Sequence, residues 1–219
     1  MTSGSLRSEQ DGYTFFGIYS EKANENQTVD FSLLPMDNNN KEPPNYGRKF
    51  VIKYELDDLC YIIKNLSQKF DDRIFLKLID FKRIKDNFLV KIGNSFLLFT
   101  IDENDDDELN ENIKKENILG IKILGIIENE TKYFNPRQKK KLFIGKNKRC
   151  DVIIEDAICD VECVVRFNKK YGWSICRKNI SQLDDDMKRN IWVSLDDEAL
   201  IQEGMIFQTG GTVFLCHLT

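Results

Sequence analysis

Short apolar segments recur along the whole chain, and residues typical of turns separate them. Lys49 and Lys53 alternate with Phe50, Ile52 and Tyr54, which predicts a strand with one solvated face and one buried face. Many short strands at regular spacing predict a β-sandwich or a barrel. The predicted strands are residues 13–20, 28–34, 49–56, 73–79, 88–93, 120–127, 141–145, 151–155, 163–167, 172–176, 191–195 and 212–218.

The chain also repeats itself, because two segments of its first half reappear in the same order in its second half. Residues 60–68 (CYIIKNLSQ) resemble residues 173–182 (WSICRKNISQ), and both combine a strand pattern with Asn-x-Ser-Gln. Residues 83–99 align without gaps with residues 200–216. A repeat of this length predicts two units of the same structure.

The second alignment places Gly93 on Gly210, so a hairpin turn is expected at the same point of both units. Between the repeats, residues 101–117 hold eight acids and two lysines. This composition predicts an extended, self-repelling linker or a very short helix, and a merely solvated loop is the alternative. The predicted organisation is an N-terminal tail (1–12), a β-sandwich (13–101), an acidic linker (102–117) and a second β-sandwich (118–219).

Composition and charge exclude several classes of protein. The net charge of −4 gives no overall attraction to nucleic acid or to a membrane surface. No apolar run approaches the ~20 residues of a membrane helix, and the first residues lack a signal core. The six cysteines form no C-x-x-C pair, and His217 is the only histidine. We therefore expect reduced thiols, no metal site and no cofactor, in a cytoplasmic protein.

Several motifs of the second repeat occur in the order of a known family. They are residues 144–146 (Ile-Gly-Lys), 150–154 (Cys-Asp-Val-Ile-Ile), 162–167, 172–175, 190–193 and 203–207. Their order and spacing resemble the forkhead-associated (FHA) domain, an all-β sandwich that reads phosphothreonine peptides. The resemblance covers about residues 118–219, and the first repeat matches only the later half of the pattern, over residues 48–101. It implies an all-β protein with two tandem FHA-like β-sandwich domains.

The resemblance also implies how a phosphopeptide would be bound, and here the chain departs from the family. In the family a serine hydroxyl and basic side chains hold the phosphate, and an asparagine holds the peptide backbone. The corresponding segment is Cys159-Asp160-Val161-Glu162, so the serine and an arginine are absent, and we expect at least one carboxylate to face the phosphate position. The candidate residues of this degenerate phosphopeptide loop are Gly145, Lys146, Cys159, Asp160, Glu162, Arg189 and Asn190.

A basic stretch lies beside this loop. Residues 137–149 hold seven basic residues and no acid, which is typical of a surface for an acidic partner, although a solvated loop is the alternative. The candidate residues of this basic patch are Arg137, Lys139, Lys140, Lys141, Lys148 and Arg149. Phe143 is the only aromatic residue among them, which argues against single-stranded nucleic acid. An acidic protein surface, such as the tails of tubulin, fits better.

These features favour a non-catalytic scaffold that binds other proteins. No Ser/His/Asp set and no phosphate-cradling glycine loop is present, so we do not expect an enzyme. The expected place is a large cytoskeletal assembly such as the ciliary axoneme, with tubulin or axonemal proteins as partners; this step is analogy with the family. The alternative is a phosphopeptide-binding adaptor that uses Lys146, Lys148, Arg149 and Arg189 as a rearranged basic cluster.

Overall fold

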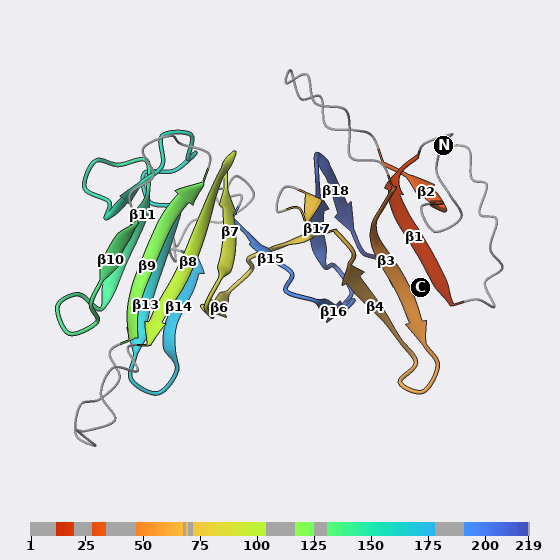
Figure 1. The fold of residues 1–219 in the computed structure, drawn as a ribbon, viewed down its shortest axis with the longest axis horizontal. Coiled ribbons are helices and arrows are strands. Elements are labelled where there is room, and N and C mark those ends of the chain that lie inside the picture. Colours follow the sequence, from red (N-terminus) through yellow and green to blue (C-terminus); the bar gives the residue numbers. More distant parts are fainter. Residues whose placement is uncertain are drawn as a thin grey trace. The chain divides into compact units, whose positions relative to one another are not determined.

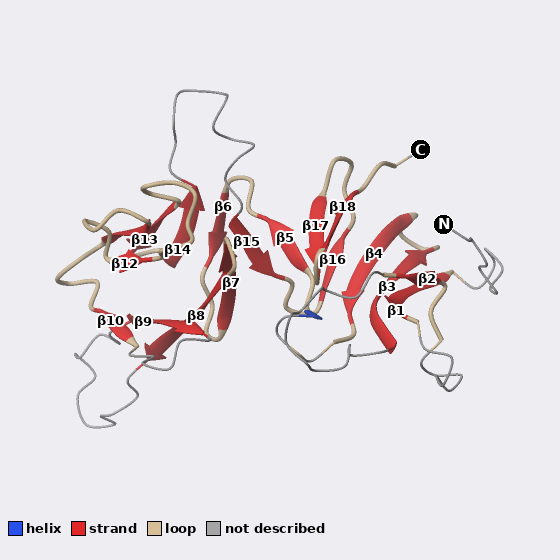
Figure 2. Ribbon diagram, turned by 90° about the horizontal axis from the view of Figure 1, so that it is seen from above, coloured by secondary structure: helices blue, strands red, loops and turns tan. Residues whose placement is uncertain are grey.

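Strands and connecting loops make up nearly all of the computed structural model (Figures 1 and 2). The structure describes residues 12–19, 28–33, 47–67, 69, 72–103, 117–124, 131–177 and 191–218. The predicted all-β fold is confirmed. The chain divides into two compact units, of which one combines two separate segments of the chain and the other is a single continuous segment.

Unit 1 consists of residues 1–76 together with residues 194–219. Its strands are β1 (Tyr13–Ile18), β2 (Phe31–Ser32), β3 (Gly47–Glu55), β4 (Cys60–Asn65), β5 (Phe75–Lys77), β16 (Glu198–Leu200), β17 (Ile206–Thr209) and β18 (Thr212–Leu215). One sheet has the order β16-β4-β3-β1-β2, and β5, β17 and β18 are neighbours in another. The core contains Phe50, Ile63 and Phe207, and Phe16 stacks on Phe50 with ring centroids 4.5 Å apart.

Unit 2 consists of residues 77–193. Its strands are β6 (Phe81–Arg83), β7 (Phe88–Ile92), β8 (Ser95–Glu103), β9 (Asn117–Leu124), β10 (Lys132–Phe134), β11 (Lys141–Gly145), β12 (Val152–Ile153), β13 (Cys163–Asn168), β14 (Gly172–Arg177) and β15 (Ile191–Ser194). The strands lie in the orders β10-β9-β8-β7-β15 and β12-β11-β13-β14-β6. Leu97, Phe99, Leu119, Val165 and Trp173 are fully buried in its core.

The two units have matching strand pairings. In unit 1, β1 pairs in parallel with β2 and antiparallel with β3, and β3 pairs antiparallel with β4. In unit 2, β11 pairs in parallel with β12 and antiparallel with β13, and β13 pairs antiparallel with β14. Strand β16 then adds to β4 as β6 adds to β14, and β17 adds to β5 as β7 adds to β15. Each unit therefore takes three strands, β6–β8 or β16–β18, from the other half of the chain.

The register of these strands supports the second of the two sequence alignments. Ala199 lies opposite Ile63, and Lys82, 117 positions before Ala199, lies opposite Ile175. Gly93 and Gly210 both adopt a left-handed conformation, with φ values of 59° and 55°. The glycine turn predicted in both units is therefore present. The Asn-x-Ser-Gln alignment is shifted by two residues over the preceding strand, because it places Ile63 on Arg177, whereas the register places Ile63 on Ile175. Its residues 179–182 lie outside the described residues.

The observed division of the chain differs from the predicted one. We expected two domains, residues 13–101 and 118–219, joined by a linker at residues 102–117. Instead, β8 and β9, on either side of that linker, pair antiparallel within unit 2, from Phe96 with Leu124 to Glu103 with Asn117. The physical reason is that β6–β8 and β16–β18 carry similar patterns. The pattern of apolar residues specifies which face of a strand is buried, but it does not specify to which of two similar sandwiches the strand belongs.

Candidate functional site

The loop after β11 is fastened to the segment that precedes β13. The Lys146 N–H donates to the Cys159 carbonyl oxygen over 3.2 Å, and the Asn147 N–H donates to the Asp160 carbonyl oxygen over 3.0 Å. A phosphate-binding loop needs backbone or side-chain donors that point at the ligand. In this loop both backbone donors already have partners within the fold.

Gly145 is required by this close approach of two backbone segments. A Cβ atom at Gly145 would lie 2.4 Å from the Asp160 carbonyl oxygen, which is closer than two such atoms can come. Gly17 has the same constraint in unit 1, where a Cβ atom would lie 2.0 Å from the Gly47 carbonyl oxygen. The glycine of the Ile-Gly-Lys motif thus serves the fold, whether or not a ligand binds.

Glu162 points into the protein, so of the two acids in this segment only Asp160 can be the carboxylate expected to face the phosphate position. The Glu162 side chain is 1% exposed, and its Oε1 accepts hydrogen bonds of 2.8 Å from the Ile158 and Cys159 N–H groups. A carboxylate satisfies two such donors at once, which explains its inward orientation. Its Oε2 is buried without a hydrogen-bond partner among the described residues. Asp160, in contrast, lies at the surface.

The cysteines of this site have a structural role. Cys163, next to Glu162, is fully buried, and burial together with the Glu162 charge raises the pKa of its thiol well above the usual range. The Cys150 thiol donates to the Asp160 carbonyl oxygen over 3.2 Å. A thiol with a raised pKa is a poor nucleophile, because the thiolate is the reactive form.

We expect Glu162→Ala to lower the free energy of unfolding by about 2–4 kcal/mol, because two partly buried backbone N–H groups lose their acceptor. Glu162→Gln keeps an acceptor oxygen of the same shape and should change the free energy by less than about 1 kcal/mol. Urea unfolding of the full chain measures both values. Equal stability of the two variants would contradict the role of Glu162 as a clamp on the loop.

The basic patch is exposed, and Lys139 and Lys141 are among its members that contact other side chains. Lys139 forms an ion pair with Asp151, whose Oδ2 also accepts the Phe143 N–H over 2.9 Å. Lys141 lies over the Phe143 ring, 4.9 Å from its centroid, and is opposite Arg166 across the β11–β13 pairing. Arg166 therefore extends the basic surface, and its place as the exposed residue of an otherwise apolar strand was the signal that could have identified it.

The other predicted site residues divide into exposed and undescribed ones. Exposed at the surface are Arg137, Lys140, Lys146, Lys148 and Arg149, and Cys159 is partly buried. Arg189 and Asn190 lie outside the described residues. The structure therefore describes three of the four members of the rearranged basic cluster, Lys146, Lys148 and Arg149.

Unit 1 contains an equivalent of this loop that the sequence analysis missed. The Phe15 N–H donates to Asp30 Oδ2 over 2.7 Å and the Asp30 N–H to the Phe15 carbonyl oxygen over 2.8 Å, and Phe143 and Asp151 form the same pair of bonds. The apolar-Gly signal was present as Phe16-Gly17, but Asp30 follows Gly17 at a longer spacing than Asp151 follows Gly145.

Register places Lys49 of unit 1 at the position that Glu162 occupies in unit 2. Lys49 is 3% exposed and forms a 2.6 Å ion pair with Asp72. A buried charge with a partner from a neighbouring loop therefore occurs at the same point of both units, with opposite sign. This position fastens loops in both units.

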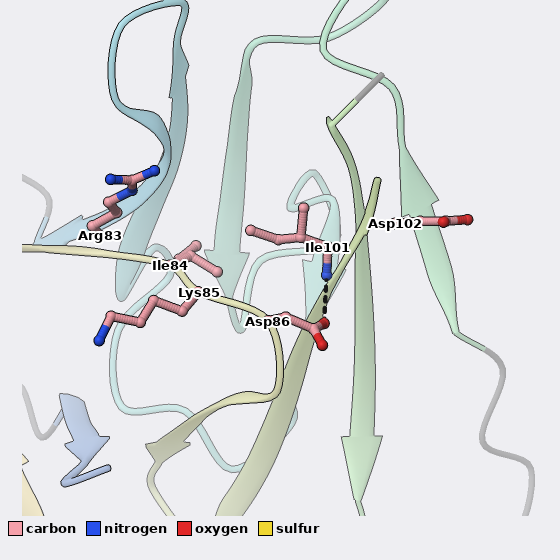
Figure 3. A pocket seen from close by; sticks show the side chains of 6 residues that line it. All are labelled: Arg83, Ile84, Lys85, Asp86, Ile101 and Asp102. Carbon is pink, nitrogen blue, oxygen red and sulfur yellow. Dashed lines mark hydrogen bonds between the residues drawn. The ribbon is translucent and has the colours of Figure 1, made fainter. Parts of the chain in front are cut away.

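A pocket of about 650 Å³ lies in unit 2 between β6 and the end of β8 (Figure 3). Asp86 Oδ1 accepts the Ile101 N–H over 3.0 Å, and the Asp102 side chain points away from Arg83 and Lys85 in Figure 3. Its described lining residues include two basic side chains, Arg83 and Lys85, and two acidic ones, Asp86 and Asp102.

Over the described ranges, no group of three His, Cys, Asp or Glu side chains could hold a metal ion. In the same part of the chain, no helix has the length and apolar character to cross a membrane. Comparisons of the chain with protein-family models, curated proteins and solved structures gave no match.

Proposed function

We propose that this protein is a non-catalytic protein-binding subunit in which an FHA-like phosphothreonine site has become a structural loop. The observation that carries the proposal is the inward position of Glu162, which binds the backbone of residues 158 and 159. Lys146 and Asn147 use their N–H groups within the fold. These hydrogen bonds hold the loop against the segment before β13, and its exposed residues include both Asp160 and basic side chains.

The exposed basic surface supports a protein partner of acidic character. Lys141 and Arg166 lie opposite each other, and Lys148 and Arg149 are exposed on the loop that follows β11. Like charges side by side on adjacent strands destabilise the isolated chain, and an acidic partner would relieve this repulsion. Placement in a cytoskeletal or ciliary assembly, with tubulin or an axonemal protein as partner, belongs to the same proposal.

A phosphothreonine peptide library should show no binding tighter than about millimolar, measured by calorimetry on the full chain. Each absent charge-assisted hydrogen bond forfeits about 1.5–3 kcal/mol, and the Asp160 carboxylate adds repulsion to a dianion. The control is the same library without phosphate. Micromolar selection of a phosphopeptide that is lost in Lys148→Ala and Arg149→Ala would overturn the proposal and establish the rearranged basic cluster.

A further inference from the structure

Strand β18 is the last strand of its sheet and pairs with β17 only, among the described residues. Its counterpart in unit 2, β8, pairs on one side with β7 and on the other with β9. The same strand of the repeated structure is therefore covered in one unit and open in the other. The segment that covers β8, which is β9, shows what kind of segment fits the open edge of β18.

The open side of β18 has backbone groups that pair with none of the described residues. The Cys216 N–H donates to the Met205 carbonyl oxygen and its own carbonyl oxygen accepts the Gly204 N–H, so both groups point toward the β17 side. Successive residues of a strand direct these groups to opposite sides. The N–H and C=O groups of Val213, Leu215 and His217 therefore point to the open side, where a further strand could pair.

An apolar groove of about 340 Å³ lies beside this open edge. It is lined by side chains from both sheets of unit 1, among them Ile52, Tyr61, Phe207, Phe214 and Cys216. Tyr61 is 45% exposed, and the others are buried or partly buried. The inner face of β18 is therefore only partly covered at this end of the sandwich.

In unit 2 the equivalent surface is closed by β9. Register places Trp173 at the position of Tyr61 and Val165 at the position of Ile52, and both are fully buried. Phe99, the counterpart of Cys216, lies opposite the buried Ile121 of β9. In unit 2 the aliphatic side chains of β9 therefore cover the inner surface that corresponds to the open groove of unit 1.

A hydrogen bond of unit 2 also marks the position of the covering strand. The Trp173 indole N–H donates to the Asn117 carbonyl oxygen at the start of β9 over 2.7 Å. Tyr61, at the equivalent register position of unit 1, lines the groove, and its side chain carries a hydroxyl group. Unit 1 therefore has an apolar surface and a side chain with a hydrogen-bonding group at this position.

The undescribed segments of this chain do not resemble β9. In β9, aliphatic residues occupy alternate positions at Leu119, Ile121 and Ile123. None of the undescribed segments has aliphatic residues at three successive alternate positions; these segments are residues 1–11, 20–27, 34–46, 104–116, 125–130 and 178–190. A second copy of β18 would not fill the groove either, because its inward side chain, Phe214, packs on its own core. The fitting occupant is a segment of another protein.

We propose that unit 1 binds an extended segment of a partner protein, which adds antiparallel to the open edge of β18 and inserts alternate aliphatic side chains into the groove beside Tyr61 and Cys216. Main-chain hydrogen bonds to β18 give affinity, and the groove selects aliphatic residues at positions i, i+2 and i+4. This site is separate from the loop at Gly145, so it does not depend on whether that loop binds a phosphopeptide.

The probe is a synthetic, fluorescently labelled peptide with the sequence of residues 117–124, measured by anisotropy on the full chain. We expect saturable binding that Leu215→Pro weakens at least about tenfold, because proline removes an N–H of the open edge that the fold does not use. Leu215→Ala is the matched control, since alanine keeps the N–H; because the exposed Leu215 side chain also lines the groove, this variant should weaken binding by less than the proline variant does. A peptide with aspartate in place of Ile121 should not bind.

A second readout does not require a mutation. Alkylation of Cys216 at alkaline pH should be slowed by the peptide, because the thiol lines the groove and burial raises its pKa. Equal binding by Leu215→Pro, or no protection of Cys216, would overturn the proposal. So would a concentration-dependent dimer that Leu215→Pro abolishes, which would identify a second copy as the occupant. Binding only after deletion of residues 1–11 would identify that segment as the occupant.

Discussion

Cutting the chain once within residues 104–116 is expected to leave the two halves in one complex. Unit 1 needs β16–β18 from the second half, and unit 2 needs β6–β8 from the first half. Separation of the halves would remove Ile201 and Phe207 from the core of unit 1, and Leu97 and Phe99 from the core of unit 2. Exposing each such side chain costs about 1.5–3 kcal/mol, so the halves should remain together.

The measurement uses an engineered protease site in the acidic segment, followed by size-exclusion chromatography before and after cleavage. The cut protein should elute with the uncut protein and separate into two fragments only in denaturant. The fragment 118–219, produced alone, should lack the hydrogen-exchange protection that β11 and β13 have in the full chain. Two folded fragments that elute separately after the cut would instead establish the tandem organisation expected from the sequence.

Trp173→Ala is expected to destabilise unit 2 by about 3–5 kcal/mol, the range for loss of a fully buried large aromatic side chain. Trp173 is 0% exposed, packs edge-on against Phe167 with ring centroids 5.2 Å apart, and bonds the start of β9. The matched variant Tyr61→Ala changes the equivalent position of unit 1. Because Tyr61 is half exposed, its loss should cost only about 1 kcal/mol.

Hydrogen exchange of the β9 and β4 amides in the two variants measures these effects unit by unit, which avoids the assumption of a single unfolding transition. Trp173→Ala should strongly increase exchange in β9, and Tyr61→Ala should leave exchange in β9 unchanged. Equal effects of the two variants on their own units would contradict the difference between a covered and an open position.

Strand positions were predictable where the chain alternates or carries β-branched and apolar residues in short runs. The predicted strand 141–145 coincides with β11, and 191–195 differs from β15 by one residue. Strand β6 was missed because Phe81, Lys82 and Arg83 are all exposed, so no pattern of burial marks them. A strand that pairs at an edge without contributing to a core leaves little signal in its sequence.

The candidate site was predictable only in part. The family resemblance predicted that the serine and arginine of a phosphate site are absent, but the sequence did not show the direction of a single side chain. Glu162 and Asp160 are both acidic and two residues apart, yet one is buried as a loop clamp and the other is exposed. That difference depends on which backbone N–H groups lack partners, and only the folded loop determines this.

The sequence by itself determined an all-β protein of two similar units, because alternation, glycine turns and the repeat are local features that hold in any arrangement of the strands. Only the tertiary structure decided that β6–β8 complete unit 2 and β16–β18 complete unit 1. The two sets of strands bury similar faces, so local physics favours neither pairing, and the choice depends on long-range contacts. The same holds for the open edge of β18, which becomes visible only beside its covered counterpart β8.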